Sequence, residues 1–202
     1  MAKLHEPVAA ASPTRIVLNA RSICEDADRF FDLCADNPDL DLELTARKEI
    51  IIMPPAGGES GALNFTVTGR VAAWTAMDGT GVGLDSSGGF RLPNGAVRAA
   101  DTSWIRRERW EAIDKELRRK FPPICPDFAL ELRSERNTLK ELKEKMEEYI
   151  ANGLQLGWLI DPFKRKVYIY RHGMPVECLD NPEYVTGDPV LRGFRLDLWD
   201  IW

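Results

Sequence analysis

The sequence has little histidine and no closely spaced cysteines. Only two histidines occur, His5 and His172, and the four cysteines are scattered without a Cys-x-x-Cys pair. A zinc site of ordinary ligand spacing is therefore not expected, and the cysteines should be reduced, partly buried thiols. Serine hydrolase chemistry is also disfavoured, because His172 alone remains as a base and no Gly-x-Ser-x-Gly occurs.

Long apolar runs are missing as well. No stretch approaches the ~20 apolar residues of a membrane-spanning helix. The opening residues, MAKLHEPVAAASPTR, lack the apolar centre of a signal peptide, so the expected location is the cytoplasm. The glycines of DGTGVG precede a strand and are not followed by Lys-Ser/Thr, so they are interpreted as turns and not as a phosphate-binding loop.

The formal net charge of −5 argues against a large non-specific DNA-binding surface. It does not exclude a nuclease, because a cluster of metal-binding carboxylates is itself acidic. The basic excess of residues 106–120, RRERWEAIDKELRRK, is interpreted first as one solvated helix. The same helix is the best candidate for phosphate contacts.

Apolar periodicity predicts an α/β protein with a mixed central sheet flanked by helices. Two regions are expected: an N-terminal arm with a short helix over residues 1–40, and a domain over residues 41–202. Helices are expected at 21–35, 60–74, 106–120 and 138–152, the last capped by Asn137 or Thr138 with Glu141 in capping-box position. Strands are expected within 42–55, in a meander of VGLD, GFRL and VRAADTSWI, at 126–133, and in a hairpin of WLID and KVYIY.

The strand at 126–133, PDFALELR, carries an unusual set of charges. Alternation places Asp127, Ala129, Glu131 and Arg133 on one face. Carboxylates from two strands with a nearby cation suit metal-dependent phosphodiester hydrolysis, because hard oxygen ligands hold Mg²⁺ and a cation stabilises the phosphate. Asp101, in RAADTSWI, is the expected partner of Glu131. Asp127 lies about 13 Å along the strand from Glu131, so it is expected to be structural or supporting.

Several stretches together resemble one family. These are PPAGGESGALN, GFRLPNGAVRAADTSWIRRERW, CPDFALELRS and LKELKEKMEEYIANGLQLGWLIDP, in this order between about Leu42 and Trp202. They resemble the bacterial putative restriction-endonuclease family, a branch of the PD-(D/E)XK nuclease superfamily. The resemblance implies a restriction-endonuclease-like fold, with Asp101 as the strand acid, Glu131-Leu132-Arg133 at the Glu-x-Lys position and Glu59 as a helix acid that assists metal binding.

Two residues depart from the superfamily pattern. Ala100 replaces the usual proline, and Arg133 replaces the lysine; arginine stays protonated and cannot act as a base. Lys145 borders the apolar stripe of its helix and could reach back to the sheet. The resemblance favours Lys145, because EKMEEY is one of the stretches that recur in the family, so Lys145 ranks above Arg133 as the catalytic cation.

The expected function is therefore a DNA endonuclease that uses Mg²⁺, with Mn²⁺ as a substitute. The alternative is a catalytically lapsed nuclease fold that serves as a nucleic-acid- or protein-binding module. A two-fold homodimer is a further expectation, because many such nucleases cut both strands as dimers. The sequence leaves open the DNA sequence or methylation specificity, the choice between DNA and RNA, and the role of the N-terminal arm.

Overall fold

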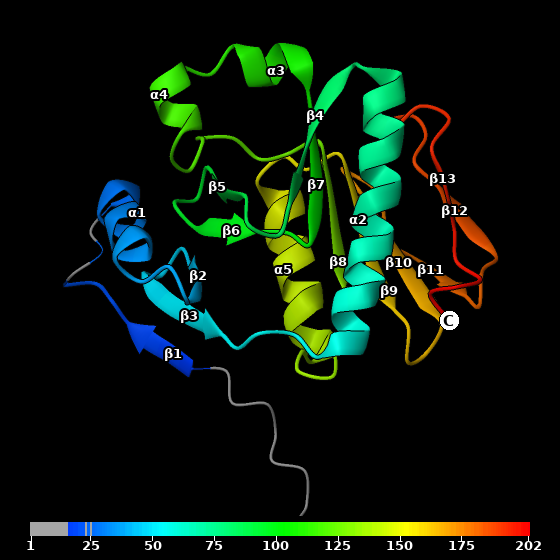
Figure 1. Cartoon of the computed structure of the whole chain (residues 1–202), viewed down its shortest axis with the longest axis horizontal. Helices are drawn as coiled ribbons and strands as arrows, with labels where there is room; N and C mark the ends of the chain where they lie inside the picture. Colours follow the sequence, from blue (N-terminus) through cyan, green and yellow to red (C-terminus); the bar gives the residue numbers. More distant parts are fainter. Residues whose placement is uncertain (1–15, 23, 25) are drawn as a thin grey trace, which may run out of the picture.

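The computed structural model describes residues 16–22, 24 and 26–202, and its main element is a six-stranded sheet (Figure 1). Strands β8 and β9 run parallel, and the other neighbouring pairs are antiparallel. The parallel pair is joined through helix α5 (Leu139–Ala151), as a parallel connection requires a crossover. In order across the sheet, the strands are β11 (Glu177–Asp180), β10 (Lys166–Arg171), β9 (Leu156–Asp161), β8 (Phe128–Leu132), β7 (Thr102–Arg106) and β4 (Gly81–Asp85).

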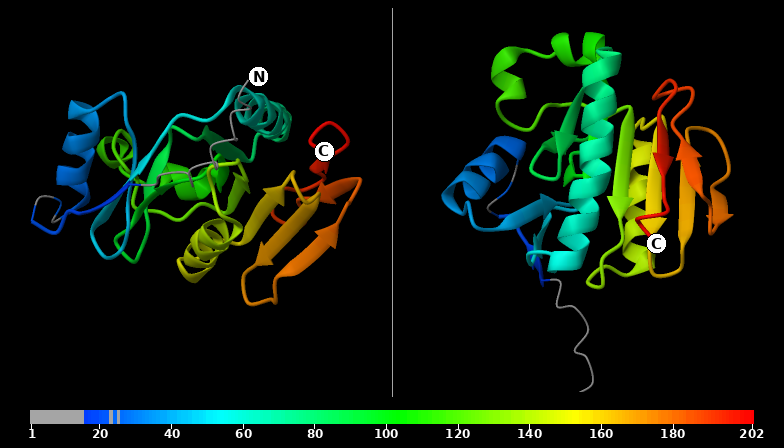
Figure 2. Two further views of the ribbon diagram at one scale, coloured as in Figure 1. Left: turned by 90° about the horizontal axis from the view of Figure 1, so that it is seen from below. Right: turned by 45° about the vertical axis from the view of Figure 1, so that its right-hand side comes forward.

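Helices α2 (Gly58–Asp78) and α5 cover opposite faces of this sheet (Figures 1 and 2). Strand β8 directs side chains to both faces of the sheet, as the alternation predicts. Phe128, Leu130 and Leu132 pack in the core on the α2 side, whereas Ala129 packs on the α5 side. Glu131 shares the Ala129 face by alternation, so the chain directs one carboxylate from a fully buried strand toward α5.

A second, five-stranded sheet lies beside the first. Its order is β1 (Ile16–Asn19), β3 (Glu49–Met53), β2 (Asp41–Leu44), β6 (Val97–Ala99) and β5 (Gly89–Arg91). Helix α1 (Ala27–Asp36) covers it by packing Phe30 in a core with Leu44, Ile50 and Val97. A separate ribbon of β12 (Tyr184–Thr186) and β13 (Arg195–Asp197) completes the described elements.

The expected meander of VGLD, GFRL and VRAADTSWI is wrong. Its last strand breaks at Ala100 and Asp101: β6 pairs with β5 and β2 in the small sheet, whereas β7 pairs with β4 and β8 in the large one. The break occurs because the two halves have different partners, which are distant in sequence. It leaves Asp101 where the chain passes from one sheet to the other.

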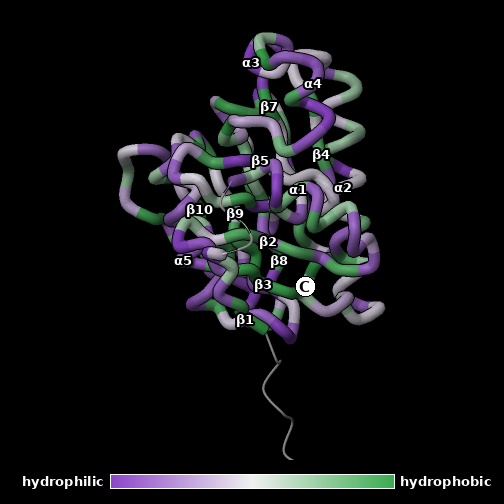
Figure 3. Tube along the Cα trace, turned by 90° about the vertical axis from the view of Figure 1, so that its left-hand side faces the viewer, coloured by the Kyte–Doolittle hydropathy of each residue, from purple (hydrophilic) through white to green (hydrophobic). Residues whose placement is uncertain are grey.

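The single helix expected over residues 106–120 is also wrong. The segment forms two short helices, α3 (Arg107–Glu111) and α4 (Lys115–Arg118). Asp114 starts the second helix, because its side chain accepts a hydrogen bond from the backbone N–H of Glu116. This largely hydrophilic segment lies at one end of the molecule (Figure 3).

Helix α5 has the expected cap. The Thr138 hydroxyl accepts from the backbone of Glu141, and the Glu141 carboxylate accepts from the backbone of Thr138. No helix in the described part of the chain is long and apolar enough to cross a membrane. The domain boundary at residue 40 stays a prediction, and residues 1–15 of the expected arm lie outside the described residues.

Candidate active site

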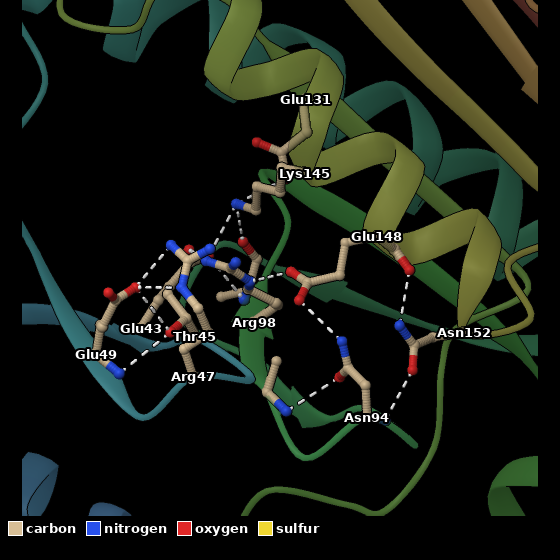
Figure 4. Close-up of polar contacts among 12 residues, drawn as sticks. Glu43, Thr45, Arg47, Glu49, Asn94, Arg98, Glu131, Lys145, Glu148 and Asn152 are labelled. Atoms are coloured by element: carbon tan, nitrogen blue, oxygen red, sulfur yellow. Dashed lines mark hydrogen bonds and ion pairs between the residues drawn. The ribbon is translucent and has the colours of Figure 1, made fainter. Parts of the chain in front are cut away.

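The ammonium group of Lys145 lies between two buried glutamates (Figure 4). Its Nζ is 2.8 Å from Glu43 Oε1 and 2.8 Å from Glu131 Oε1, and it donates to the carbonyl oxygen of Ala99 at 2.7 Å. An ammonium has three N–H donors. All three donors of Lys145 therefore have an oxygen neighbour within the protein.

Three different elements supply these side chains. Glu131 comes from β8 and Glu43 from β2, while Lys145 is on α5 between Leu142 and Met146, which pack in the core. The side chains of Glu43, Glu131 and Lys145 are 3%, 5% and 13% exposed, so water screens their charges only weakly. The site thus forms only when both sheets and α5 are in place.

Glu43 has a second cationic neighbour. Arg98 on β6 lies 2.9 Å from Glu43 Oε2 and donates through Nε to Glu148 Oε2 at 2.6 Å. The backbone N–H of Ala99 donates to Glu43 Oε1 at 3.1 Å. Glu43 is consequently held as an anion by two side-chain cations and one backbone donor.

Asp101 lies at the break between β6 and β7, and is partly exposed. Its Oδ2 accepts a hydrogen bond of 2.7 Å from the backbone N–H of Leu132, the residue after Glu131. The two carboxylates are close enough for the charge of Asp101 to raise the pKa of Glu131. The structure therefore brings together the pair that the sequence predicts for metal binding.

The carboxylates of the site differ in their affinity for protons. Burial, opposed by Lys145 and reinforced by Asp101 and Glu43, raises the pKa of Glu131 to about 8. Burial also raises the pKa of Asp101. Burial acts in the same direction on Glu43, but the charges of Lys145 and Arg98 outweigh it and lower the pKa of that residue. The site contains more carboxylate than the neighbouring cations neutralise.

Arg133 has other partners. Its guanidinium lies 2.8 Å from Asp161 Oδ2 at the end of β9, donates to the carbonyl oxygen of Asn137 at 3.3 Å and sits over the ring of Phe163. Lys145, in contrast, contacts Glu131 directly. The geometry thus favours the ranking of Lys145 above Arg133. Ala100, which precedes Asp101, is 1% exposed.

Asp127 is satisfied by arginines. Its Oδ2 accepts from the backbone N–H of Arg106 at 2.9 Å, its Oδ1 accepts from Arg106 Nε at 3.0 Å, and Arg109 lies 2.9 Å from Oδ2. With 0% exposure, this carboxylate has enough partners to be stable as a charged group. Its contacts fit a structural role that joins β7 and α3 to the start of β8.

Glu59 has no described contact with this cluster. It is exposed in the first turn of α2, and no hydrogen bond or ion pair between described residues joins it to Asp101 or Glu131. The third carboxylate at Lys145 is Glu43, which the sequence interpretation missed. A signal was present: Leu-Glu-Leu occurs at 42–44 and again at 130–132. A charged residue between two large apolar neighbours on a strand is seldom placed there for solubility.

The chemistry of this donor set fits a hard divalent cation. Asp101 and Glu131 offer carboxylate oxygens, and their raised pKa values mean that a nearby positive charge would be favourable. Within residues 16–22, 24 and 26–202, no three or more His, Cys, Asp or Glu side chains are arranged to hold an ion. Asp101 and Glu131 are the side chains that would hold a divalent cation here, with waters completing its coordination.

Comparisons with known proteins define the class. Residues 27–198 match the profile of the Uma2 family, described as "Putative restriction endonuclease". The chain belongs to this family, and the α/β fold with its mixed sheet is of the restriction-endonuclease-like kind. A search of curated proteins gives no match.

A solved structure supports the fold independently. It is described as a putative nuclease belonging to DUF820 from Anabaena variabilis, and it aligns with a TM-score of 0.72 at 20% sequence identity. The alignment covers 87% of this chain and 96% of that chain. At this identity the likeness establishes the shared fold over nearly the whole of both chains.

Proposed function

We propose that this protein is a metal-dependent endonuclease that hydrolyses phosphodiester bonds in DNA. The observation that supports the proposal is the cluster of Glu43, Asp101 and Glu131 with Lys145, on the fold of a restriction-endonuclease family. The cluster has three carboxylates and, with Arg98, two cations, and carboxylates with perturbed pKa values are concentrated at functional sites.

Asp101 and Glu131 would hold Mg²⁺, or Mn²⁺ in its place. When bound, the ion would lower the pKa of a water and neutralise charge on the phosphate. Burial favours the protonated form of Glu131, so this residue would have to lose its proton to bind the ion. The positive charge of an approaching dication would favour that loss. We assign to Glu43 the supporting role expected of Glu59, because Glu43 shares Lys145 with Glu131.

Lys145 would orient the attacking water and stabilise the negative phosphate. Since its Nζ already lies within 2.8 Å of three oxygens, it must leave at least one of them to contact a substrate. The water oxygen forms a bond to phosphorus, and the bond from phosphorus to the leaving sugar oxygen breaks. The proton of the water goes to solvent, and the leaving oxygen takes a proton from solvent.

A second function is a catalytically lapsed nuclease fold that binds nucleic acid or protein. The observation in its favour is the same contact: Lys145 lies where it neutralises Glu43 and Glu131 without any added cation. In this case the ion pairs stabilise the fold, and the excess charge has no catalytic role.

Cleavage of supercoiled plasmid DNA separates the two functions. With Mg²⁺ or Mn²⁺, we expect cleavage by the native protein and loss of cleavage in Glu131→Ala. Asp180→Ala is the matched control, because it removes an exposed carboxylate whose ion pair among the described residues is with Lys166 on the neighbouring strand. Single-stranded RNA in parallel tests the class of nucleic acid.

Metal binding gives a second measurement that does not depend on turnover. Calorimetric titration with Mn²⁺ should show binding to the native protein and weaker binding to Asp101→Asn and Glu131→Gln. Absence of both binding and cleavage in the native protein would refute the enzyme and leave the lapsed fold.

A further inference from the structure

Tyr149 has a buried hydroxyl without a partner. The residue is 0% exposed, and its hydroxyl has no hydrogen bond to any described residue. A buried polar group left unpaired is unfavourable, and such groups in native structures call for an explanation. The ring packs in the core on the α5 side of the sheet, so the apolar part of the side chain is accounted for.

The position of Tyr149 relates this hydroxyl to the candidate site. Tyr149 follows Lys145 by four residues on α5, so the two side chains lie on one face of the helix. The charges of Lys145, Glu131, Glu43 and Arg98 all act on the phenol. Burial raises the pKa of Tyr149 well above its usual value, so the hydroxyl keeps its proton and remains a donor.

Glu131 needs another hydrogen-bond donor when Lys145 turns away from it to a substrate phosphate. Its Oε1 lies 2.8 Å from Lys145 Nζ, but the pair is poorly aligned, and the oxygen has no hydrogen bond of good geometry within the described chain. If Lys145 turns to a phosphate, this buried oxygen loses its one close cation. An unused O–H donor one helical turn away can replace it.

We propose that Tyr149 is a positioning residue whose hydroxyl donates to the Glu131 carboxylate when Lys145 turns from Glu131 to the substrate phosphate. The inference rests on the proposed function for the identity of the substrate. The exchange of donors itself concerns only Lys145, Tyr149 and Glu131, so it is testable without substrate.

The first experiment measures thermal unfolding of metal-free protein in two backgrounds. In the native background, Tyr149→Phe removes an unpaired hydroxyl, so the melting temperature should stay equal or rise slightly. In Lys145→Met, the Tyr149 hydroxyl should donate to the Glu131 carboxylate in place of the lysine. In this background Tyr149→Phe should therefore lower the melting temperature by about 2–4 °C. Lys145→Gln replaces Lys145→Met if the latter does not fold.

Tyr170→Phe is the matched control. Tyr170 packs in the same core from β10 and is 3% exposed, and the charges acting on its phenol include Glu147 and none from the Lys145 cluster. Its substitution should have the same effect in both backgrounds. Equal effects of Tyr149→Phe in both backgrounds would overturn the proposal, since they are what a hydroxyl satisfied by a structural water would give.

The second experiment is kinetic. If the native protein cleaves DNA, Tyr149→Phe should lower kcat about 10-fold with an unchanged KM and melting temperature, because the hydroxyl acts after Lys145 has met the substrate. An unchanged kcat would contradict the proposal. If the native protein does not cleave DNA, the proposed nuclease function fails, and the unfolding experiment still decides the role of Tyr149.

Discussion

Asp127, just before β8, and Glu131, within it, are both buried, yet their surroundings are opposite. Asp127 has two arginines and a backbone N–H for one carboxylate. Glu131 shares one lysine with Glu43, and Asp101 is near enough to repel it. The first arrangement stabilises a charge, and the second leaves a charge that the fold disfavours.

The difference shows which of two similar residues is suited to chemistry. A carboxylate with all its partners in place gains little from an added ligand, because its charge is already compensated. A carboxylate whose pKa burial raises to about 8 gains greatly from an added cation. Perturbed groups of the second kind are concentrated at functional sites.

The largest effect should follow removal of Lys145. Lys145→Met should lower kcat/KM for plasmid cleavage by about 10²–10³, the cost typical of removing one group that stabilises transition-state charge. Arg133→Met should lower kcat/KM far less, because Arg133 contacts Asp161 and Phe163. Circular dichroism must show that both variants are folded at the assay temperature, and an equal loss in the two variants would contradict the assignment.

The next effect is on the pH dependence of stability. Folding raises the pKa of Glu131 from 4.5 to about 8, so the folded state binds a proton at Glu131 more tightly than the unfolded state does. Its stabilising contribution is complete below pH 4.5 and is lost as the pH rises to about 8. With chelator present, the free energy of unfolding should fall by on the order of 5 kcal/mol over this window.

Glu131→Gln should remove most of this fall, because glutamine does not titrate. Asp101, whose pKa burial also raises, adds a smaller decline of the same sign, and Glu43 acts oppositely but only below its ordinary pKa. Urea unfolding of both proteins from pH 5 to pH 8.5 measures the difference. Parallel curves would show that Glu131 is not the group responsible.

A smaller loss of stability is expected from substitution of Asp127, the carboxylate that has all its partners. Asp127→Asn leaves Arg106 and Arg109 without their anion and should destabilise the protein by about 2 kcal/mol, less than the 3–5 kcal/mol of a fully buried pair, because the arginines are 50% and 34% exposed. Cleavage per folded molecule should not change. A loss of cleavage in folded Asp127→Asn would move this residue into the catalytic group.

The smallest effect concerns the start of the helix that carries Lys145. Thr138→Ala removes the capping box of α5 and should lower the free energy of unfolding by about 1 kcal/mol. Lys145 lies two turns further on, so kcat should stay unchanged. Thermal unfolding and a cleavage assay measure the two quantities, and a fall in kcat would show that α5 does not hold Lys145 rigidly.

Local patterns predicted the parts of the fold that depend on neighbours in sequence. The alternation along β8 and the cap of α5 are set by adjacent residues, and the structure confirms both. The mixed sheet and the family were also predicted correctly. The sequence also predicted that Asp101 lies near Glu131, but it placed Asp101 within a strand, whereas the residue lies between β6 and β7.

What depends on distant partners was missed. The break at Asp101 arises because β6 and β7 pair with strands of different sheets, and nothing within VRAADTSWI shows this. Glu43 was missed for the same reason: it reaches Lys145 from a strand about one hundred residues earlier in the chain. Glu59 was chosen by analogy with a helix acid, whereas here the third carboxylate comes from β2.

Lys145 joins the two sheets as well as two side chains. Glu43 belongs to the five-stranded sheet and Glu131 to the six-stranded one, so their common lysine spans the boundary between the two layers. The geometry of the cluster consequently depends on how α1 and β3 pack, through residues such as Phe30 and Ile50 that lie in a separate core. For the proposed nuclease, a shift of about 1 Å in that packing should cost about 10²-fold in rate.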